Sequence, residues 1–109
     1  MSMTEFGFEF YAEVPDPGDR LRQEAERRLL ALTEGHTDIV GASVAVEPLG
    51  DQTTDRRYEA RVVVYMRPDN QAATEKADSP PGALKGALDA VERQVRAYRD
   101  KHRETWKKK

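Results

Sequence analysis

The chain has 109 residues, of which 35% are charged and none is cysteine. This length allows one domain with one modest core, so we expect no large enclosed cofactor site. Without cysteine the chain has no disulfide, thiolate metal site or cysteine nucleophile, which fits a cytoplasmic protein. The N-terminal residues lack the pattern of a secretory signal, and no apolar run approaches the ~18 residues of a membrane span. We therefore expect no membrane partner.

Charge is distributed unevenly along the sequence, although the formal net charge is only -2. Residues 1–84 carry 9 Lys+Arg against 16 Asp+Glu, whereas residues 85–109 carry 9 against 4. The C-terminal segment is therefore basic and the remainder is acidic. Such a chain can bind phosphates at one end while its other surfaces repel nucleic acid.

The first two expected elements are a strand and a helix. Phenylalanine at every second position predicts a strand over residues 5–14. Apolar residues at helical spacing then predict a helix of about 15 residues that starts near Arg20 and stops at Gly35. The positions that define these patterns are Phe6, Phe8 and Phe10 in the strand and Leu21, Ala25, Leu29 and Leu32 in the helix.

Three more strands are expected over residues 39–47, 58–67 and 71–77. The third strand has an apolar face that runs from Tyr58 to Met66 and a mixed face that contains Arg61, Tyr65 and Arg67. Turn signals rich in proline, glycine, aspartate and asparagine separate the three strands. Because the connections are short, these strands should form an antiparallel meander.

The last element is a long amphipathic helix, for which Ser79 is the expected N-cap. It should run to about Glu104, followed by a frayed basic tail over residues 105–109. Its apolar stripe must pack on the sheet beside that of the first helix. We predict an α+β fold for residues 1–109 as a single domain: a β-α-β-β-β-α two-layer sandwich with two helices on one face of a four-stranded sheet. The stripe comprises Leu84, Leu88, Val91, Val95 and Tyr98.

Residues suited to catalysis are scarce. His36 and His102 are the only histidines, and neither has a recognisable ligand partner near it in sequence. The helical carboxylates lie among arginines, which favours solvated ion pairs over acid–base chemistry. We expect a protein that is not an enzyme, with no catalytic residue, metal, cofactor or small-molecule substrate. The carboxylates are Glu24, Glu26, Glu92 and Glu104.

Basic residues line one flank of the last helix when residues are placed at about 100° intervals. Asp89 and Glu92 interrupt this flank in its first half, so the clean basic surface begins at Arg96. One interpretation is a solvated helix face whose basic end offsets the helix dipole. The other is a ridge that follows a nucleic-acid backbone, which Arg61 and Arg67 can extend and beside which Tyr65 can stack on a base. The flank comprises Lys85, Arg96, Arg99, Arg103 and Lys107.

Residues 83–101, with Val91-Glu92-Arg93-Gln94-Val95 at their centre, resemble the C-terminal helix of the ribosome hibernation-promoting factor family, also called ribosome-associated inhibitor A. Ala90 and Ala97 replace basic residues that are usual in that family. The resemblance implies the same order of elements. It also implies binding to the small ribosomal subunit near the decoding centre, over tRNA and mRNA positions, which holds ribosomes inactive without chemistry.

The resulting hypothesis is a cytoplasmic translation inhibitor, monomeric or weakly dimeric, that binds ribosomal RNA of the small subunit. An alternative is a protein-interaction adaptor or stress regulator that uses the last helix and Trp106. A third is a generic double-stranded RNA-binding domain, but residues 78–82 lack the basic cluster that such domains need there. The expected phosphate contacts are Lys85, Arg93, Arg96, Arg99, Lys101 and Arg103, with Arg22 and Arg28 on the first helix as weaker candidates.

Overall fold

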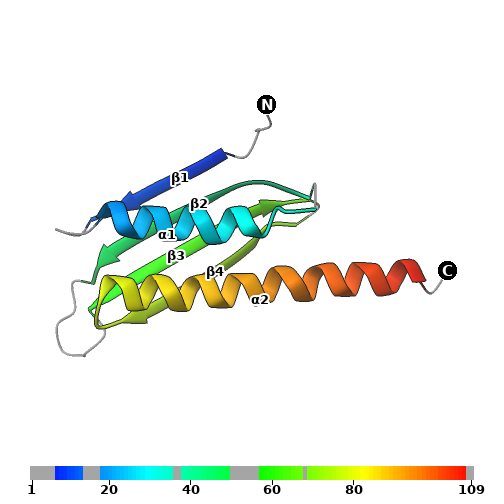
Figure 1. Ribbon diagram of the computed structural model, residues 1–109. Coiled ribbons are helices and arrows are strands. Elements are labelled where there is room, and N and C mark those ends of the chain that lie inside the picture. The colour runs from blue at the N-terminus through cyan, green and yellow to red at the C-terminus, as the bar shows by residue number, and fades with distance from the viewer. Residues whose placement is uncertain (1–6, 14–17, 36–37, 50–56, 68, 108–109) are drawn as a thin grey trace.

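A computed structural model describes residues 7–13, 18–35, 38–49, 57–67 and 69–107, with backbone alone for 102–107. The order of elements confirms the predicted strand–helix–strand–strand–strand–helix arrangement and the α+β class (Figure 1). The fourth strand, whose polar side chains make it the weakest pattern in the sequence, is regular. The elements are β1 (Gly7–Ala12), α1 (Gly18–Ala31), β2 (Ile39–Pro48), β3 (Tyr58–Met66), β4 (Gln71–Ala77) and α2 (Pro80–Lys107).

The four strands form one sheet in the order β1-β2-β3-β4. The pairs β2–β3 and β3–β4 are antiparallel, which confirms the meander. In contrast, β1 lies parallel to β2, in a register that begins with Gly7 opposite Gly41 and ends with Ala12 opposite Val46. Parallel neighbours need a crossover connection, and α1 supplies it.

The core lies between the sheet and the two helices, which both cover the same face (Figure 1). Alternate residues of β2 and β3 point into it, so each strand has one buried and one open side. No helix of the described residues covers the opposite face of the sheet. The buried strand residues are Ala42, Val44, Val46, Ala60, Val62, Val64, Met66 and Ala73, and α1 adds Leu21, Ala25, Leu29 and Leu32.

Two helix ends follow the predicted signals. The chain leaves α1 through turn hydrogen bonds, such as that from the Thr33 amide to the Leu30 carbonyl at 3.0 Å, and reaches Gly35 at φ 73°. Glycine adopts this left-handed conformation without strain, so Gly35 ends the turns that follow the last helical residue, Ala31. At the start of α2, the Gly82 amide donates to Ser79 Oγ at 3.1 Å, so Ser79 is the N-cap.

The last helix is longer than its pattern indicated. It continues to Lys107, three residues beyond the expected end at Glu104. Lysine, arginine and glutamate are good helix formers, and no glycine or proline follows Gly86 to stop the helix. At 28 residues it is about 42 Å long, and its C-terminal end projects beyond the sheet (Figure 1). Residues 108–109 of the expected frayed tail lie outside the described residues.

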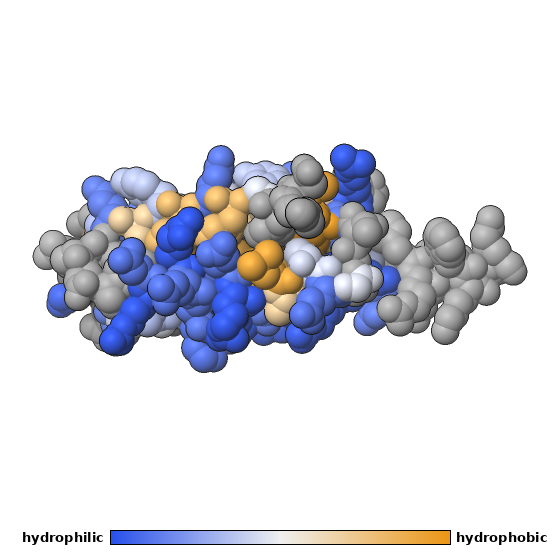
Figure 2. Space-filling model, turned by 45° about the horizontal axis from the view of Figure 1, so that its top comes forward, coloured by the Kyte–Doolittle hydropathy of each residue, from blue (hydrophilic) through white to orange (hydrophobic). Residues whose placement is uncertain are grey.

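Hydrophilic side chains cover most of the surface seen in Figure 2, and hydrophobic side chains gather in a limited band. In the described part of the chain, no helix is long and apolar enough to cross a membrane.

Candidate nucleic-acid interface

The apolar stripe fixes how α2 is rotated about its axis. Leu84 and Leu88 are at most 1% exposed, and Val91 and Val95 are fully buried against the sheet. At the end of the stripe, the Tyr98 hydroxyl donates to Asp69 Oδ2 at 3.3 Å. Desolvation, followed by the charge of Asp69, raises the pKa of Tyr98 above its ordinary value. With the stripe buried, the charged flanks of α2 have defined directions.

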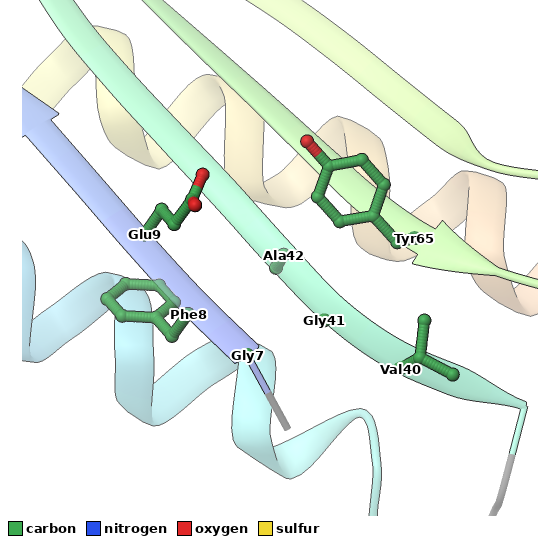
Figure 3. Close-up of a pocket in the computed structure, with 7 residues that line it drawn as sticks. All are labelled: Gly7, Phe8, Glu9, Val40, Gly41, Ala42 and Tyr65. Carbon is green, nitrogen blue, oxygen red and sulfur yellow. The ribbon is translucent and has the colours of Figure 1, made fainter. Parts of the chain in front are cut away.

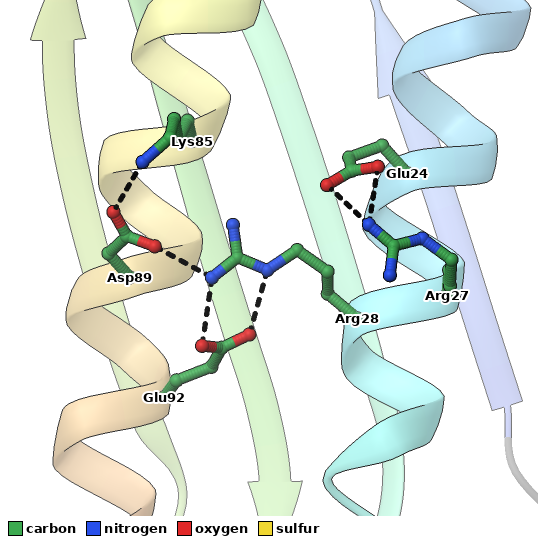
Figure 4. A network of polar contacts seen from close by, with 6 residues as sticks. All are labelled: Glu24, Arg27, Arg28, Lys85, Asp89 and Glu92. Atoms are coloured by element: carbon green, nitrogen blue, oxygen red, sulfur yellow. Dashed lines mark hydrogen bonds and ion pairs between the residues drawn. The ribbon is translucent and has the colours of Figure 1, made fainter.

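One flank of α2 faces α1, and Arg28 of α1 bridges the two helices (Figure 4). Its Nε and Nη2 donate to the two carboxylate oxygens of Glu92 at 2.9 and 2.8 Å. Nη2 also donates to Asp89 Oδ1 at 2.7 Å. The Arg28 and Glu92 side chains are only 17% and 16% exposed. We call Arg28, Asp89 and Glu92 the interhelix clamp.

These contacts shift the pKa values of Arg28 and Asp89. The hydrogen bonds to Glu92 hold the pKa of Arg28 above its usual value, although burial opposes this. The hydrogen bond from Arg28, followed by that from Lys85, holds the pKa of Asp89 below its usual value. Lys85 Nζ lies 3.2 Å from Asp89 Oδ2, yet its side chain stays 74% exposed. Lys85 therefore pairs with Asp89 while most of its side chain faces solvent.

Arg99 makes the second bridge. Its Nε and Nη2 donate to the two oxygens of Asp38, each at 2.8 Å, and Nη2 also donates to the Leu32 carbonyl at 2.9 Å. The Leu32 carbonyl lies just after the C-terminal end of α1, where backbone acceptors lack helix partners and a cation is favourable. The Arg99 side chain is 13% exposed. We call Arg99, Asp38 and Leu32 the Arg99 anchor; it ties the second half of α2 to the α1–β2 connection.

The structure thus divides the eight expected phosphate contacts. Arg28 and Arg99 are engaged inside the protein, whereas Arg93 and Arg96 are exposed and form no ion pair with any described residue. Arg22 lies 4.0 Å from Glu26 and 5.8 Å from the centre of the Phe8 ring, a cation–π distance. Lys101 is exposed, and the Arg103 side chain lies outside the described residues. We call Arg93 and Arg96 the exposed pair.

Comparison with known proteins adds the evidence of descent. Residues 12–103 match the family described as sigma 54 modulation protein / S30EA ribosomal protein. The chain belongs to this family. The match confirms the relationship inferred from residues 83–101, and it supports a ribosome-associated role in general.

Two solved structures share the fold of this family member. The N-terminal domain of Protein Y from Thermus thermophilus has a TM-score of 0.68 at 18% identity, over 85% of this chain and 98% of that one. A ribosomal subunit interface protein from Coxiella burnetii also has a TM-score of 0.68, at 13% identity, over 87% and 99%. No curated protein matches by sequence at a significant level.

Sequence reasoning missed the roles of Asp38, Asp89 and Glu92 in this family member. It treated Glu92 as a solvated carboxylate, whereas Glu92 is a mostly buried acceptor of Arg28. The Arg28–Glu92 and Arg99–Asp38 pairs join residues 64 and 61 positions apart, and no local pattern indicates such pairings. Among the described residues, no group of three or more His, Asp or Glu is arranged to hold a metal ion.

Proposed function

We propose that the domain is a non-enzymatic factor that occupies the small ribosomal subunit near the tRNA and mRNA sites and inhibits translation. Membership of a ribosome-associated family supports the general role. The observation that supports an RNA contact on α2 is the exposed pair, Arg93 and Arg96, which has no competing ion pair among the described residues. Occupancy alone blocks tRNA and mRNA in this mechanism, so no catalytic group is needed.

In this proposal the exposed pair contacts phosphates, and Lys85, Lys101 and Arg103 extend the contact along α2. Each guanidinium or ammonium that neutralises a phosphate releases a counterion, so salt weakens the complex. Arg22 adds a contact from α1. Arg28 and Arg99 act indirectly, because their bridges fix the direction in which α2 presents its cations.

The uneven charge of the chain supports one orientation on RNA. Residues 1–84 are acidic overall and residues 85–109 are basic. The C-terminal half of α2 is therefore drawn toward phosphates while the acidic body is repelled. We propose that the domain acts as a monomer or weak dimer in the cytoplasm, and that α2 is the element that contacts the RNA.

Sedimentation with purified small subunits, at low and at physiological salt, tests this function. We expect the wild type to sediment with the subunits and the double variant Arg93→Ala/Arg96→Ala to remain mostly in the supernatant at physiological salt. Arg27→Ala is the matched control, because it removes one arginine that is 70% exposed and paired locally with Glu24 on α1. Absence of the wild type from the pellet even at low salt would refute ribosome binding.

The same assay separates this function from a protein-interaction role. Loss of binding in Trp106→Ala, with full binding in Arg93→Ala/Arg96→Ala, would indicate a protein partner instead. A translation assay with purified components then tests inhibition: the wild type should lower the yield, and the double variant should restore it. Sedimentation without inhibition would contradict the placement near the tRNA and mRNA sites.

A further inference from the structure

A groove lies on the sheet face that the helices leave open, where β1, β2 and β3 adjoin (Figure 3). We propose that this groove binds a guanine base of single-stranded RNA, with the base stacked on Tyr65 and its Watson–Crick edge read by Glu9. The groove is open to solvent and has a volume of about 520 Å³. The sheet lies between this groove and the basic side chains of α2, so the groove is separate from the proposed α2 interface.

The floor of the groove is bare backbone where Gly7 and Gly41 meet, and Val40 lines the groove next to them. Gly7 of β1 and Gly41 of β2 lie opposite each other in the sheet. A Cβ on Gly41 would lie 2.7 Å from the Gly7 carbonyl oxygen, so any side chain there would force the two strands apart. Two adjacent glycines leave a flat area without side chains, and a planar base can approach the backbone closely there.

Tyr65 forms one wall. It lies opposite Gly41 on β3, and its side chain is on the open face, where the residue is 37% exposed. Its hydroxyl donates to Ser43 Oγ of β2 at 3.4 Å, which holds the ring beside the glycine floor. Single-stranded RNA is commonly recognised by bases that stack on exposed aromatic rings of a sheet.

Glu9 forms the other wall and is the charged residue that lines the groove. Figure 3 shows Glu9 and Tyr65 rising from strands on either side of β2, on the same side of the sheet. A carboxylate has two acceptor oxygens and no donor. Guanine presents two adjacent donors, the ring N1–H and the exocyclic amino group, which match such a carboxylate. Uracil and adenine do not offer this pair of donors, so guanine fits best.

The charges on β3 favour RNA over a basic peptide. Arg61 shares the open face with Tyr65, because side chains on a strand alternate between faces, and Arg67 directly follows β3, two positions beyond Tyr65. Both are exposed, and neither forms an ion pair with any described residue. They provide a phosphate path along β3 on both sides of the stacking ring. The same two cations would repel an arginine-rich peptide, although an arginine side chain could otherwise fit between Tyr65 and Glu9.

Apart from Glu9, the acidic residues on this face of β1–β3 lie at the Arg61 end of that path, beyond Arg61 as seen from Tyr65. Glu13, Glu47 and Glu59 occupy one row across the end of the sheet opposite to Arg67, since Glu47 pairs with Glu59 and the Glu13 amide bonds the Val46 carbonyl. Phosphates next to a bound base therefore meet Arg61 and Arg67 before they meet these carboxylates. Lys76 stands opposite Glu59 and offsets part of that charge.

NMR titration of the whole chain with short oligoribonucleotides tests the groove without ribosomes. The probe is a run of uridines with one central guanosine, and the all-uridine oligomer is its control. We expect the guanosine oligomer to shift the amide signals of Gly7, Glu9, Gly41 and Tyr65, and to bind about tenfold more tightly than the control. Equal affinity for both oligomers, or shifts confined to α2, would overturn the proposal.

Variants test each wall separately. Tyr65→Leu should weaken binding about tenfold, whereas Tyr65→Phe, which keeps the ring, should retain it. Glu9→Gln should remove the preference for guanosine. Gly7→Val should block the groove, because a Cβ at Gly7 meets nothing within 4 Å and so fits without moving a strand. Retained binding in Gly7→Val, with an unchanged spectrum of the core, would contradict the site.

Two further titrations distinguish an RNA strand from a free nucleotide, and RNA from a protein partner. Guanosine monophosphate alone should bind far more weakly than the oligomer, because Arg61 and Arg67 need neighbouring phosphates; equal affinity would refute a site for an RNA strand. An arginine-rich peptide that shifts the same amides in place of RNA would assign the groove to a protein. Arg93→Ala/Arg96→Ala should leave the affinity for the oligomer unchanged. The proposal for the groove and the proposal for the α2 interface can therefore be refuted separately.

Discussion

Arg28 and Glu92 form a bidentate ion pair, with nitrogen–oxygen distances of 2.9 and 2.8 Å, that joins α1 to α2. The pair is mostly buried and shares its guanidinium with Asp89. Because removal of one partner leaves the other desolvated without compensation, such a pair is sensitive to mutation even where its net contribution is modest. The direction of α2 therefore depends on polar contacts as well as on its apolar stripe.

Arg28→Ala should lower the free energy of unfolding by about 2 kcal/mol, because Glu92 and Asp89 lose charge-assisted hydrogen bonds in a partly buried site. Urea denaturation at neutral pH measures the change. Arg27→Ala is the control and should cost less than about 0.5 kcal/mol, since its pair with Glu24 is solvent-exposed. Equal effects of the two substitutions would show that the interhelix clamp does not stabilise the fold.

Asp89 should make stability depend on pH in the acid range. Arg28 and Lys85 lower its pKa in the folded state, so the folded protein binds this proton less readily than the unfolded chain does. The stabilisation is complete above the ordinary aspartate pKa of 3.8 and is lost as pH falls through the lower folded value. Asp89→Asn should thus be less stable than wild type at pH 7, and the difference should shrink below about pH 4. A difference in unfolding free energy that stays constant from pH 7 to pH 2 would contradict this.

Arg96 and Arg99 should differ in how salt affects ribosome binding. Arg96→Ala removes a proposed phosphate contact, so the slope of log affinity against log salt should fall by about 1. Arg99→Gln breaks the Arg99 anchor, so affinity should fall while the slope stays near that of wild type. Binding to purified small subunits over a range of salt concentrations measures both. A lower slope in Arg99→Gln would mean that Arg99 leaves Asp38 to contact RNA directly.

Amide hydrogen exchange gives a reading of the Arg99 anchor that needs no ribosome. Arg99→Gln should speed exchange in the turn after α1 and in the second half of α2, since the Leu32 carbonyl and Asp38 lose their hydrogen bonds from the Arg99 guanidinium. Arg96→Ala serves as the control and should leave exchange there unchanged. Equal exchange in the two variants would argue against a positioning role for Arg99.

Gly41→Ala should destabilise the protein by about 1–3 kcal/mol, because its Cβ would clash with the Gly7 carbonyl oxygen and push β1 from β2. Gly7→Ala, on the opposite strand, is the matched control: its Cβ has open space and should be nearly neutral. Thermal denaturation of both variants measures the effect. A stable Gly41→Ala protein would show that the β1–β2 approach can relax.

Most of the fold could be predicted from the sequence because its signals are local. Alternating apolar residues define β2 and β3, and the turn residues between strands permit only short antiparallel connections. Ser79 and Gly35 mark helix ends through their own backbone chemistry. The residues of α2 point to the family because their order along one helix is itself the signal. The end of α2 was less predictable, since no stop residue follows the stripe.

The sequence by itself determined the two-layer α+β architecture, the buried faces and the concentration of basic residues at the C-terminal end, because periodicity and composition are readable along the chain. Only the tertiary structure decided which basic side chains of α2 remain available for phosphate contacts. Arg96 and Arg99 lie on the same flank in a helical projection, yet Asp38, 61 positions before Arg99, takes Arg99 into an internal ion pair. The groove between Glu9 and Tyr65 likewise exists only because β1 pairs with β2 through two glycines. Both depend on contacts between distant segments, and chain folding sets these contacts.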